Sequence, residues 1–90
     1  MLGKIKTPPN VAFGQVLREL RKERQLSQES LALEAGVQRN YVSLIERGVN
    51  QPTITTIFKR AAALEVSPSA MLSLVEAQAG LSSPQMPKQR

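Results

Sequence analysis

A short run of polar side chains near the middle of the chain offers hydrogen-bond donors and acceptors at helical spacing. Arg39 carries a planar fork of donors, Asn40 an amide and Ser43 a hydroxyl, and the apolar Leu44 follows. These groups match DNA base edges, since a guanidinium fits guanine, an amide fits adenine and an aliphatic side chain fits the thymine methyl group. We predict that all four residues read bases. Two alternatives stay open: Arg39 could contact only phosphate, and Leu44 could pack at the edge of the core.

These side chains would be positioned by a short helix that opens at Gln38 or Arg39. Val42 and Ile45 recur three residues apart in it and are expected to face the interior. The polar residues on the remaining face are then directed outward, where a partner can reach them.

A second short helix is expected just before this one. Ser27 can cap its N-terminus, and Leu31 and Ala35 fall on one face, four residues apart. Gly36 stands where a left-handed residue would end the helix after about two turns, and Val37 is expected to plug the turn. Two short helices joined by a tight turn are the layout of a helix-turn-helix element, whose second helix enters the major groove of DNA.

An ordered series of short matches connects this region to a known family. The matching residues are Leu26-Ser27-Gln28, Ala32, Gly36-Val37, Tyr41-Val42-Ser43, Ile45-Glu46-Arg47-Gly48 and Pro52-Thr53. Through them residues 13–72 resemble the XRE/Cro-type family of bacterial and phage transcriptional regulators. The resemblance implies an all-α fold, a compact five-helix lambda-repressor-like domain with the helix-turn-helix at helices 2 and 3, and a function in transcription regulation.

The same resemblance implies an ion pair inside the fold. In the similar repressors, the arginine seven positions before the glutamine that opens the second helix bonds a glutamate late in the third helix. The same offset from Gln28 joins Arg21 to Glu46. The alternative is that both residues are solvated surface charges.

Contacts to DNA phosphates are expected from side chains around the helix-turn-helix element. Gln28 matches the family's glutamine at the start of the second helix, where free N–H groups and the helix dipole also favour an anion. Tyr41 is expected to offer its hydroxyl to a phosphate, with core packing as the alternative. The other predicted phosphate contacts are Gln38, Arg47, Asn50, Gln51 and Thr53. Four further cations are expected to form a solvated face: Arg18, Lys22, Lys59 and Arg60.

The chain as a whole divides into a flexible N-terminal arm, a helical DNA-binding domain and a flexible tail. These three parts are residues 1–9, 10–80 and 81–90. The lysines of the arm could touch DNA, although a disordered leader is the favoured interpretation. The tail holds two prolines and has no apolar pattern.

Three further helices are predicted from caps and apolar spacing. Asn10 can cap the first, which runs to about Gln25 and buries Phe13, Val16, Leu17 and Leu20. Thr53 can cap the fourth, which runs through Leu64. Its expected buried residues are Ile54, Ile57, Phe58, Ala61 and Leu64. Ser67 can cap the fifth, with Pro68 at its first position and Gly80 at its end.

The fifth helix has more apolar residues than one inward stripe needs. They are Met71, Leu72, Leu74 and Val75. One side can close the domain, and we expect the other, through Leu74 and Val75, to pair two copies so that their recognition helices lie about 34 Å apart. The alternative is that this patch packs against the tail. No small-molecule effector is expected, because the 10 residues after Gly80 are too few for a pocket.

The composition agrees with a DNA partner and excludes several other classes. Twelve Lys and Arg against seven acidic residues give a net charge of +5, which fits a polyanion, although surplus charge alone often serves solubility. The absence of Cys and His excludes disulfides, thiolate or imidazole metal sites and Ser/His or Cys/His catalysis. No enzyme activity and no cofactor are expected. The chain has neither a membrane-length apolar run nor a signal peptide, so a cytoplasmic location is expected.

These observations predict a dimeric repressor or autoregulator that reads a pseudo-palindromic operator in double-stranded DNA. Three narrower roles stay open: a phage-type repressor, a restriction-modification controller protein and an antitoxin. The alternative from another class is a protein-interaction module, such as an antitoxin or cofactor, whose basic surface holds a protein partner and binds DNA weakly.

Overall fold

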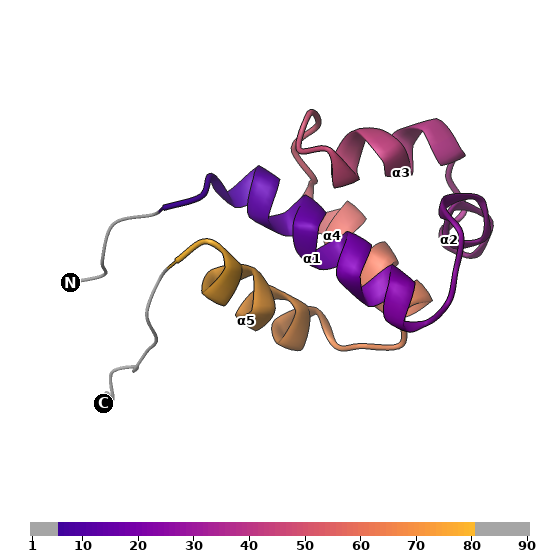
Figure 1. Ribbon diagram of the computed structural model, residues 1–90. Coiled ribbons are helices and arrows are strands. Elements are labelled where there is room, and N and C mark those ends of the chain that lie inside the picture. Colours follow the sequence, from indigo (N-terminus) through magenta and orange to yellow (C-terminus); the bar gives the residue numbers. More distant parts are fainter. Residues whose placement is uncertain (1–5, 81–90) are drawn as a thin grey trace.

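The computed structural model describes residues 6–80, which contain five α-helices and no strand. The helices are α1 (Pro9–Glu23), α2 (Gln28–Ala35), α3 (Arg39–Glu46), α4 (Ile54–Ala63) and α5 (Pro68–Gln78). Figure 1 shows them in chain order from indigo to yellow. The predicted all-α fold with five helices is therefore confirmed. No helix in residues 6–80 combines the length and apolar character needed to cross a membrane.

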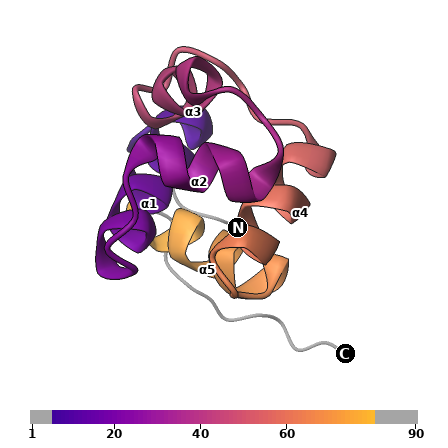
Figure 2. The same cartoon turned by 90° about the vertical axis from the view of Figure 1, so that its right-hand side faces the viewer.

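The first helix is the centre of the arrangement. It packs against α3 on one side and α5 on the other, while α2 packs against α3 and α4, and α4 packs against α5. Figure 2, viewed at 90° to the first, shows α2 and α3 as neighbours joined by a short turn. The core lies between these helices, and its largest apolar members are Phe13, Leu17, Leu31, Ile45, Leu64 and Met71.

Four of the helix ends use the same local device. After α1, α2, α3 and α4 comes a residue in the left-handed region, and the next residue donates its N–H to the carbonyl five positions earlier. The left-handed residues are Gln25 (φ 59°), Gly36 (φ 73°), Gly48 (φ 75°) and Glu65 (φ 60°). The bonds that follow them are Leu26 to Arg21, Val37 to Ala32, Val49 to Leu44 and Val66 to Ala61. These closures reverse the chain sharply, so successive helices can pack on one core.

The predicted side-chain N-caps are confirmed at three of four positions. The hydroxyls of Ser27, Thr53 and Ser67 each accept a hydrogen bond from the backbone N–H three residues later. The cap expected at Asn10 is wrong, because Pro8 stands at the N-cap and α1 begins at Pro9. The Asn10 side chain instead donates from Nδ2 to the carbonyl of Gly48, at 2.8 Å.

The predicted buried face of α1 is confirmed in its first two turns. Phe13, Val16 and Leu17 are buried, whereas Leu20 is only partly buried. The helix stops at Glu23, two residues before the predicted end, because Gln25 has already turned into the left-handed region.

The predicted buried face of α4 is correct for three residues and wrong for two. Ile57, Ala61 and Leu64 are buried as expected. Ile54 and Phe58, however, are 68% and 57% exposed. The helix is rotated relative to the prediction, so Thr56 and Arg60 are buried in the two interior positions expected for Ile54 and Phe58. This rotation leaves an apolar pair on the surface and places a cation inside.

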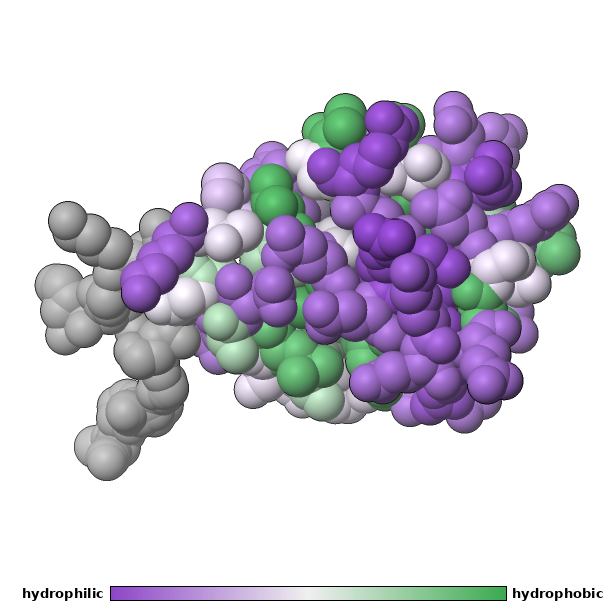
Figure 3. Space-filling model, in the orientation of Figure 1, coloured by the Kyte–Doolittle hydropathy of each residue, from purple (hydrophilic) through white to green (hydrophobic). Residues whose placement is uncertain are grey.

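The fifth helix separates the two residues predicted to pair copies of the chain. Met71 and Val75 face the interior, and Val75 is only 8% exposed, so it belongs to the domain's own core. Leu72 and Leu74 are the large apolar residues of α5 that reach the surface, at 41% and 47% exposure. Figure 3 shows a hydrophobic area over α5 on an otherwise largely hydrophilic face.

The domain extends a few residues beyond its predicted N-terminal boundary. Pro9 is the first residue of α1, and the N–H groups of Lys6 and Thr7 donate to the carbonyl of Ala79, at 2.9 and 3.2 Å. The two ends of the domain therefore lie together (Figure 1). The rest of the predicted arm, residues 1–5, and the predicted tail, residues 81–90, lie outside the described residues.

Candidate nucleic-acid interface

The outer face of α3 carries the residues predicted to read bases. Arg39 and Asn40 in its first turn are exposed, and Ser43 and Leu44 are half-buried one turn later. The inward face is formed by Val42 and Ile45, both 0% exposed. The structure therefore brings the four predicted residues onto one helix. Arg39 and Asn40 are the most accessible of them.

A buried ion pair fixes α3 to α1. The Arg21 guanidinium donates from Nε to Oε2 of Glu46 at 2.6 Å and from Nη2 to Oε1 at 3.1 Å. Its Nη1 donates to the carbonyl of Leu26, at 2.8 Å, so every guanidinium nitrogen has a partner. The two side chains are 11% and 3% exposed. The predicted pair is confirmed, and the alternative of two solvated charges is wrong.

The same carboxylate also holds α2. Gln28, the first residue of α2, donates from Nε2 to Oε1 of Glu46, at 3.0 Å. Its amide therefore has an internal partner that the sequence did not indicate. One amide hydrogen and the amide oxygen remain for other contacts, and the contact of Gln28 with phosphate stays a prediction. Glu46 thus ties three helices together beneath the outward face of α3.

Close backbone packing fixes the far end of α3. A Cβ atom placed on Gly14 of α1 would lie 2.3 Å from the carbonyl oxygen of Ile45 and 2.7 Å from that of Glu46. Only a glycine lets α1 approach the last turn of α3 this closely. The bond from Asn10 to the carbonyl of Gly48 holds the chain just beyond that turn.

Most of the predicted phosphate contacts surround α3 on accessible surface. Gln38 precedes the helix and is exposed, and Arg47 and Gln51 are exposed in the loop after it. Asn50 in the same loop is half-buried. Thr53 is exposed at the start of α4. Within the described residues, no predicted phosphate contact is completely enclosed.

A chain of three hydroxyls joins α3 to the N-terminus of α4. Thr53 Oγ1 accepts from the backbone N–H of Thr56 at 3.0 Å, and its hydroxyl donates to Thr56 Oγ1 at 3.1 Å. The Thr56 hydroxyl in turn lies 3.2 Å from the Tyr41 hydroxyl, and the two share a hydrogen bond. Tyr41 is half-buried and packs against the core, which agrees with core packing, the alternative predicted for this residue. Its contact with phosphate stays a prediction.

Beneath this chain lies a cation that the sequence did not place in the interior. Arg60, expected on a solvated face, is 0% exposed, and that expectation is wrong. Its Cζ atom lies 5.3 Å from the centroid of the Tyr41 ring, a cation–π arrangement. Its Nε, Nη1 and Nη2 atoms are buried without a hydrogen-bond partner in the described chain. Burial lowers the pKa of the Arg60 guanidinium, and the interaction with Tyr41 acts in the opposite direction.

Comparisons with known proteins agree with this arrangement. The HTH_3 family model, described as helix-turn-helix, matches residues 17–71. The control protein C.BamHI of Bacillus amyloliquefaciens is 41% identical over 61 residues, which are 67% of this chain and 75% of that protein.

Two solved structures of restriction-modification controller proteins are also similar. C.AhdI from Aeromonas hydrophila is 46% identical, with a TM-score of 0.66 over 68% of this chain and 92% of the other. C.Esp1396I, solved as a tetramer in complex with its natural 35 base-pair operator, is 26% identical, with a TM-score of 0.75 over 81% and 96% of the two chains. Controller proteins are therefore among the similar proteins both by sequence and by structure.

Proposed function

The chain belongs to the HTH_3 family of helix-turn-helix regulators, as its XRE/Cro-type residues predicted, and we propose that it is a dimeric, sequence-specific repressor or autoregulator. Its target would be a pseudo-palindromic operator in double-stranded DNA. The general function, DNA binding in transcription regulation, is shared by the relatives with which it aligns. The proposal adds base reading, symmetry and repression.

One observation carries the proposal: the exposed first turn of α3 stands on a rigid base. Arg39 and Asn40 project from a helix whose opposite face is fully buried and whose last residue, Glu46, bonds α1 and α2. A site that reads bases needs donors held in one orientation, because discrimination depends on hydrogen-bond geometry. The major groove accommodates such a helix with its N-terminal residues toward the bases.

The surrounding polar residues would hold the phosphates on either side of the groove. On this proposal Gln28 and Gln38 lie toward one strand, and Arg47, Asn50, Gln51, Thr53 and Tyr41 toward the other. Contacts of this kind set register and affinity and carry little sequence information. Only Arg47 among them is charged, so the salt dependence of binding would come from Arg47 and the other cations of the domain.

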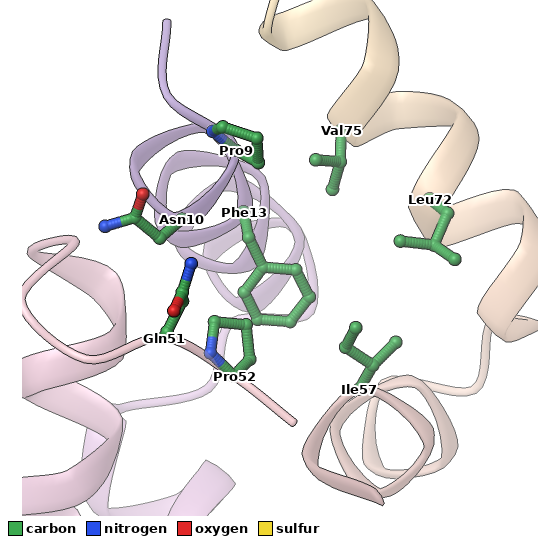
Figure 4. Close-up of a pocket in the computed structure, with 8 residues that line it drawn as sticks. All are labelled: Pro9, Asn10, Phe13, Gln51, Pro52, Ile57, Leu72 and Val75. Carbon is green, nitrogen blue, oxygen red and sulfur yellow. The ribbon is translucent and has the colours of Figure 1, made fainter. Parts of the chain in front are cut away.

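Of the two residues predicted to pair copies of the chain, Leu74 is exposed and its role stays a prediction, whereas Val75 is not available, and α4 offers a further apolar surface. Val75 is in the core, whereas Ile54 and Phe58 form an exposed apolar pair one turn apart on α4. A hollow of about 200 Å³ lies nearby between α1, α4 and α5, and its walls include Phe13, Ile57 and Leu72 (Figure 4). We therefore propose that two copies meet through Ile54, Phe58 and Leu72. Burial of this surface would remove an exposed apolar patch from water.

The comparisons favour one of the narrower roles. The similarity to C.BamHI and C.AhdI extends over most of the length of those controller proteins. C.Esp1396I was solved in complex with its operator, which supports operator binding by this chain as well. We propose a controller-type regulator that would bind at a promoter and so block or assist transcription. It would catalyse no reaction of its own.

The proposal is tested by selecting bound duplexes from a random DNA pool at near-physiological salt and sequencing the survivors. We expect a two-fold motif with half-sites about 10 bp apart. In the same assay Arg39→Ala and Asn40→Ala should each relax the base preference at one position of the half-site and weaken binding by about 1–3 kcal/mol. Lys59→Ala, which removes an exposed cation from α4, is the matched control and should keep the preference.

Three results would count against parts of the proposal. A motif without two-fold symmetry would contradict the dimer. Unchanged base preference in both α3 variants would contradict base reading by that helix. Absence of any enriched sequence, together with capture of a protein partner that depends on the basic surface, would favour the protein-interaction alternative.

A further inference from the structure

A completely buried arginine without hydrogen-bond partners is an unusual component of a small domain. The guanidinium of Arg60 is 0% exposed, and none of its three nitrogen atoms has a partner within the described residues. An arginine side chain keeps its charge at any ordinary pH. Taking a cation out of water is unfavourable unless nearby groups compensate for its lost hydration. The visible compensation is the face of Tyr41, 5.3 Å away.

The position of Arg60 connects it to the proposed phosphate-binding edge. It lies on α4 one turn after Thr56, so its side chain is directed back toward the N-terminus of its own helix. Its cation sits against the same tyrosine whose hydroxyl bonds Thr56. The cation, the ring and the start of α4 therefore form one contiguous cluster.

The hydrogen bonds at the start of α4 favour one direction for the tyrosine proton. Thr53 accepts from the Thr56 N–H and donates its own proton to Thr56 Oγ1. Thr56 is buried, and within the described residues its hydroxyl bonds Thr53 and Tyr41. Either hydroxyl of the Thr56–Tyr41 pair can donate, and donation by Thr56 gives its buried proton an acceptor. In that arrangement the phenolic proton of Tyr41 is left to donate to another acceptor.

This orientation is favoured by the charges around it. With each hydroxyl donating to the next, the O–H dipoles run from Thr53 through Thr56 to Tyr41, and hydrogen bonds in such a chain polarise one another. A cation against the ring favours a phenol that presents its proton to an outside acceptor. The exposed N–H groups of Ile54 and Thr55 lie in the first turn of α4 and have no backbone acceptor in the described chain, so they add positive potential at the same edge.

We propose that Arg60 is a positioning residue for DNA binding: its buried cation holds the Tyr41 ring and directs the tyrosine hydroxyl at one phosphate beside the start of α4. The inference rests on the proposed function, since it assigns to Arg60 the support of one phosphate contact. Arg60 does not touch the DNA. It acts through Tyr41 and through its charge, which is little screened because the site excludes water.

The proposal predicts that stability and DNA affinity change in opposite directions. Arg60→Met keeps the length of the side chain and removes the charge. Replacing a buried charge by an apolar residue of similar volume is often neutral or stabilising, so the melting temperature should stay the same or rise. The Kd for the duplex enriched in the selection should increase about five- to tenfold, the size of a favourable charge effect at a partly buried helix terminus. Arg60→Lys, which keeps the charge, should restore much of the affinity.

A double-mutant cycle tests whether Arg60 acts through Tyr41. Tyr41→Phe removes the hydroxyl and keeps the ring. If the effect passes through that hydroxyl, Arg60→Met should change the Kd much less in the Tyr41→Phe background than in the wild type. Lys59→Met is the matched control, because it removes one positive charge from the neighbouring position of the same helix but from an exposed side chain. Its effect on the Kd should be smaller than that of Arg60→Met and independent of Tyr41.

The possible failures are distinguishable. A folded Arg60→Met variant with lower melting temperature and unchanged Kd would show that the arginine is only structural, and would overturn the proposal. So would equal effects of Arg60→Met with and without the Tyr41 hydroxyl. Should Arg60→Met not fold, the cycle is measured with Arg60→Gln, which also removes the charge, and an unchanged Kd together with no coupling to Tyr41 overturns the proposal. If the wild-type protein enriches no DNA sequence, the proposed function itself fails, and this inference fails with it.

Discussion

Two arginines are buried in this small domain, and their surroundings are opposite. Arg21 forms two hydrogen bonds with the carboxylate of Glu46 and one with a backbone carbonyl, so its charge and all its nitrogen atoms are satisfied. Arg60 is more deeply buried and has only the face of Tyr41 beside it. The first arginine lies where α1, α2 and α3 meet, and the second lies beneath the start of α4.

The difference indicates what each residue contributes. A paired and fully bonded buried charge adds little net stability, but it specifies one arrangement of the helices, because any other arrangement leaves a charge without a partner. An unpaired buried charge costs stability, and proteins retain such costs mainly where a function uses them. Arg21 therefore belongs to the architecture that orients α3, and Arg60 is the residue for which function is the better explanation.

The largest effect is expected from breaking the paired arginine. Glu46→Ala leaves the Arg21 guanidinium buried without its carboxylate and also removes the partner of Gln28. We expect the free energy of unfolding to fall by about 3–5 kcal/mol, most of the stability of a domain this size. Chemical denaturation followed by circular dichroism would measure it.

A control on the surface separates charge loss from pair loss. Glu76→Ala removes an exposed carboxylate of α5 and should change the free energy of unfolding by no more than about 0.5 kcal/mol. If Glu46→Ala were equally mild, the buried pair would not be the determinant of α3 orientation, and the contrast between the two arginines would be lost.

The sequence predicted the elements better than it predicted their buried faces. Helix starts at Ser27, Thr53 and Ser67 and the end at Gly36 depend on local chemistry, a hydroxyl cap or a residue free to adopt positive φ, and each is confirmed. The Arg21–Glu46 pair joins residues 25 positions apart, and it was predicted from family resemblance because no local pattern contains it.

The interior side of α4 shows why the rest escaped prediction. Ile54, Ile57 and Phe58 fit the spacing of an inward stripe, yet Ile54 and Phe58 are exposed. Hydrophobic periodicity assigns arginine and threonine to water by residue type. In the fold, the methylene stem of Arg60 packs as an apolar chain, and the Thr56 hydroxyl finds a partner in Tyr41, 15 residues away. Both compensations come from another helix, so they cannot be read from α4 alone.

A smaller loss is expected from changing how α1 approaches α3 without touching either charge of the pair. In Gly14→Ala the new Cβ would overlap the carbonyl oxygens of Ile45 and Glu46, at 2.3 and 2.7 Å. These are backbone atoms, so α3 must shift. We expect a loss of about 2–3 kcal/mol in the free energy of unfolding, as in strongly overpacked cores.

The shift should also affect DNA binding, which sharpens the comparison. In Gly14→Ala the displaced residue is Glu46. In double-mutant cycles measured on the Kd for DNA, Gly14→Ala should therefore couple strongly to Glu46→Gln and weakly to Arg60→Met. Equal coupling to both would mean that the two arginines do not act independently.

The smallest effects are expected at a third arginine, Arg24, whose ion pair is on the surface. Arg24 donates from Nη1 to Glu65 at 2.8 Å, and the two side chains are 42% and 75% exposed. An exposed pair of this kind contributes about 0–1 kcal/mol. Glu65 also has a positive φ of 60°, and Gln25 at the end of α1 has nearly the same angle, 59°, without an ion pair.

These two matched positions allow the surface pair to be measured. Glycine relieves the steric strain of positive φ at some entropic cost, so Gln25→Gly should raise the free energy of unfolding by up to about 1 kcal/mol. Glu65→Gly gains the same relief but loses the bond to Arg24, so its gain should be smaller by the value of the pair, and the difference should shrink in high salt. Equal gains would mean that the surface pair contributes nothing, as it does in many proteins. If the gain from Glu65→Gly were smaller than that from Gln25→Gly by well above about 1 kcal/mol, the exposed Arg24 would contribute as much as the buried Arg21. Burial would then not explain why the three arginines differ.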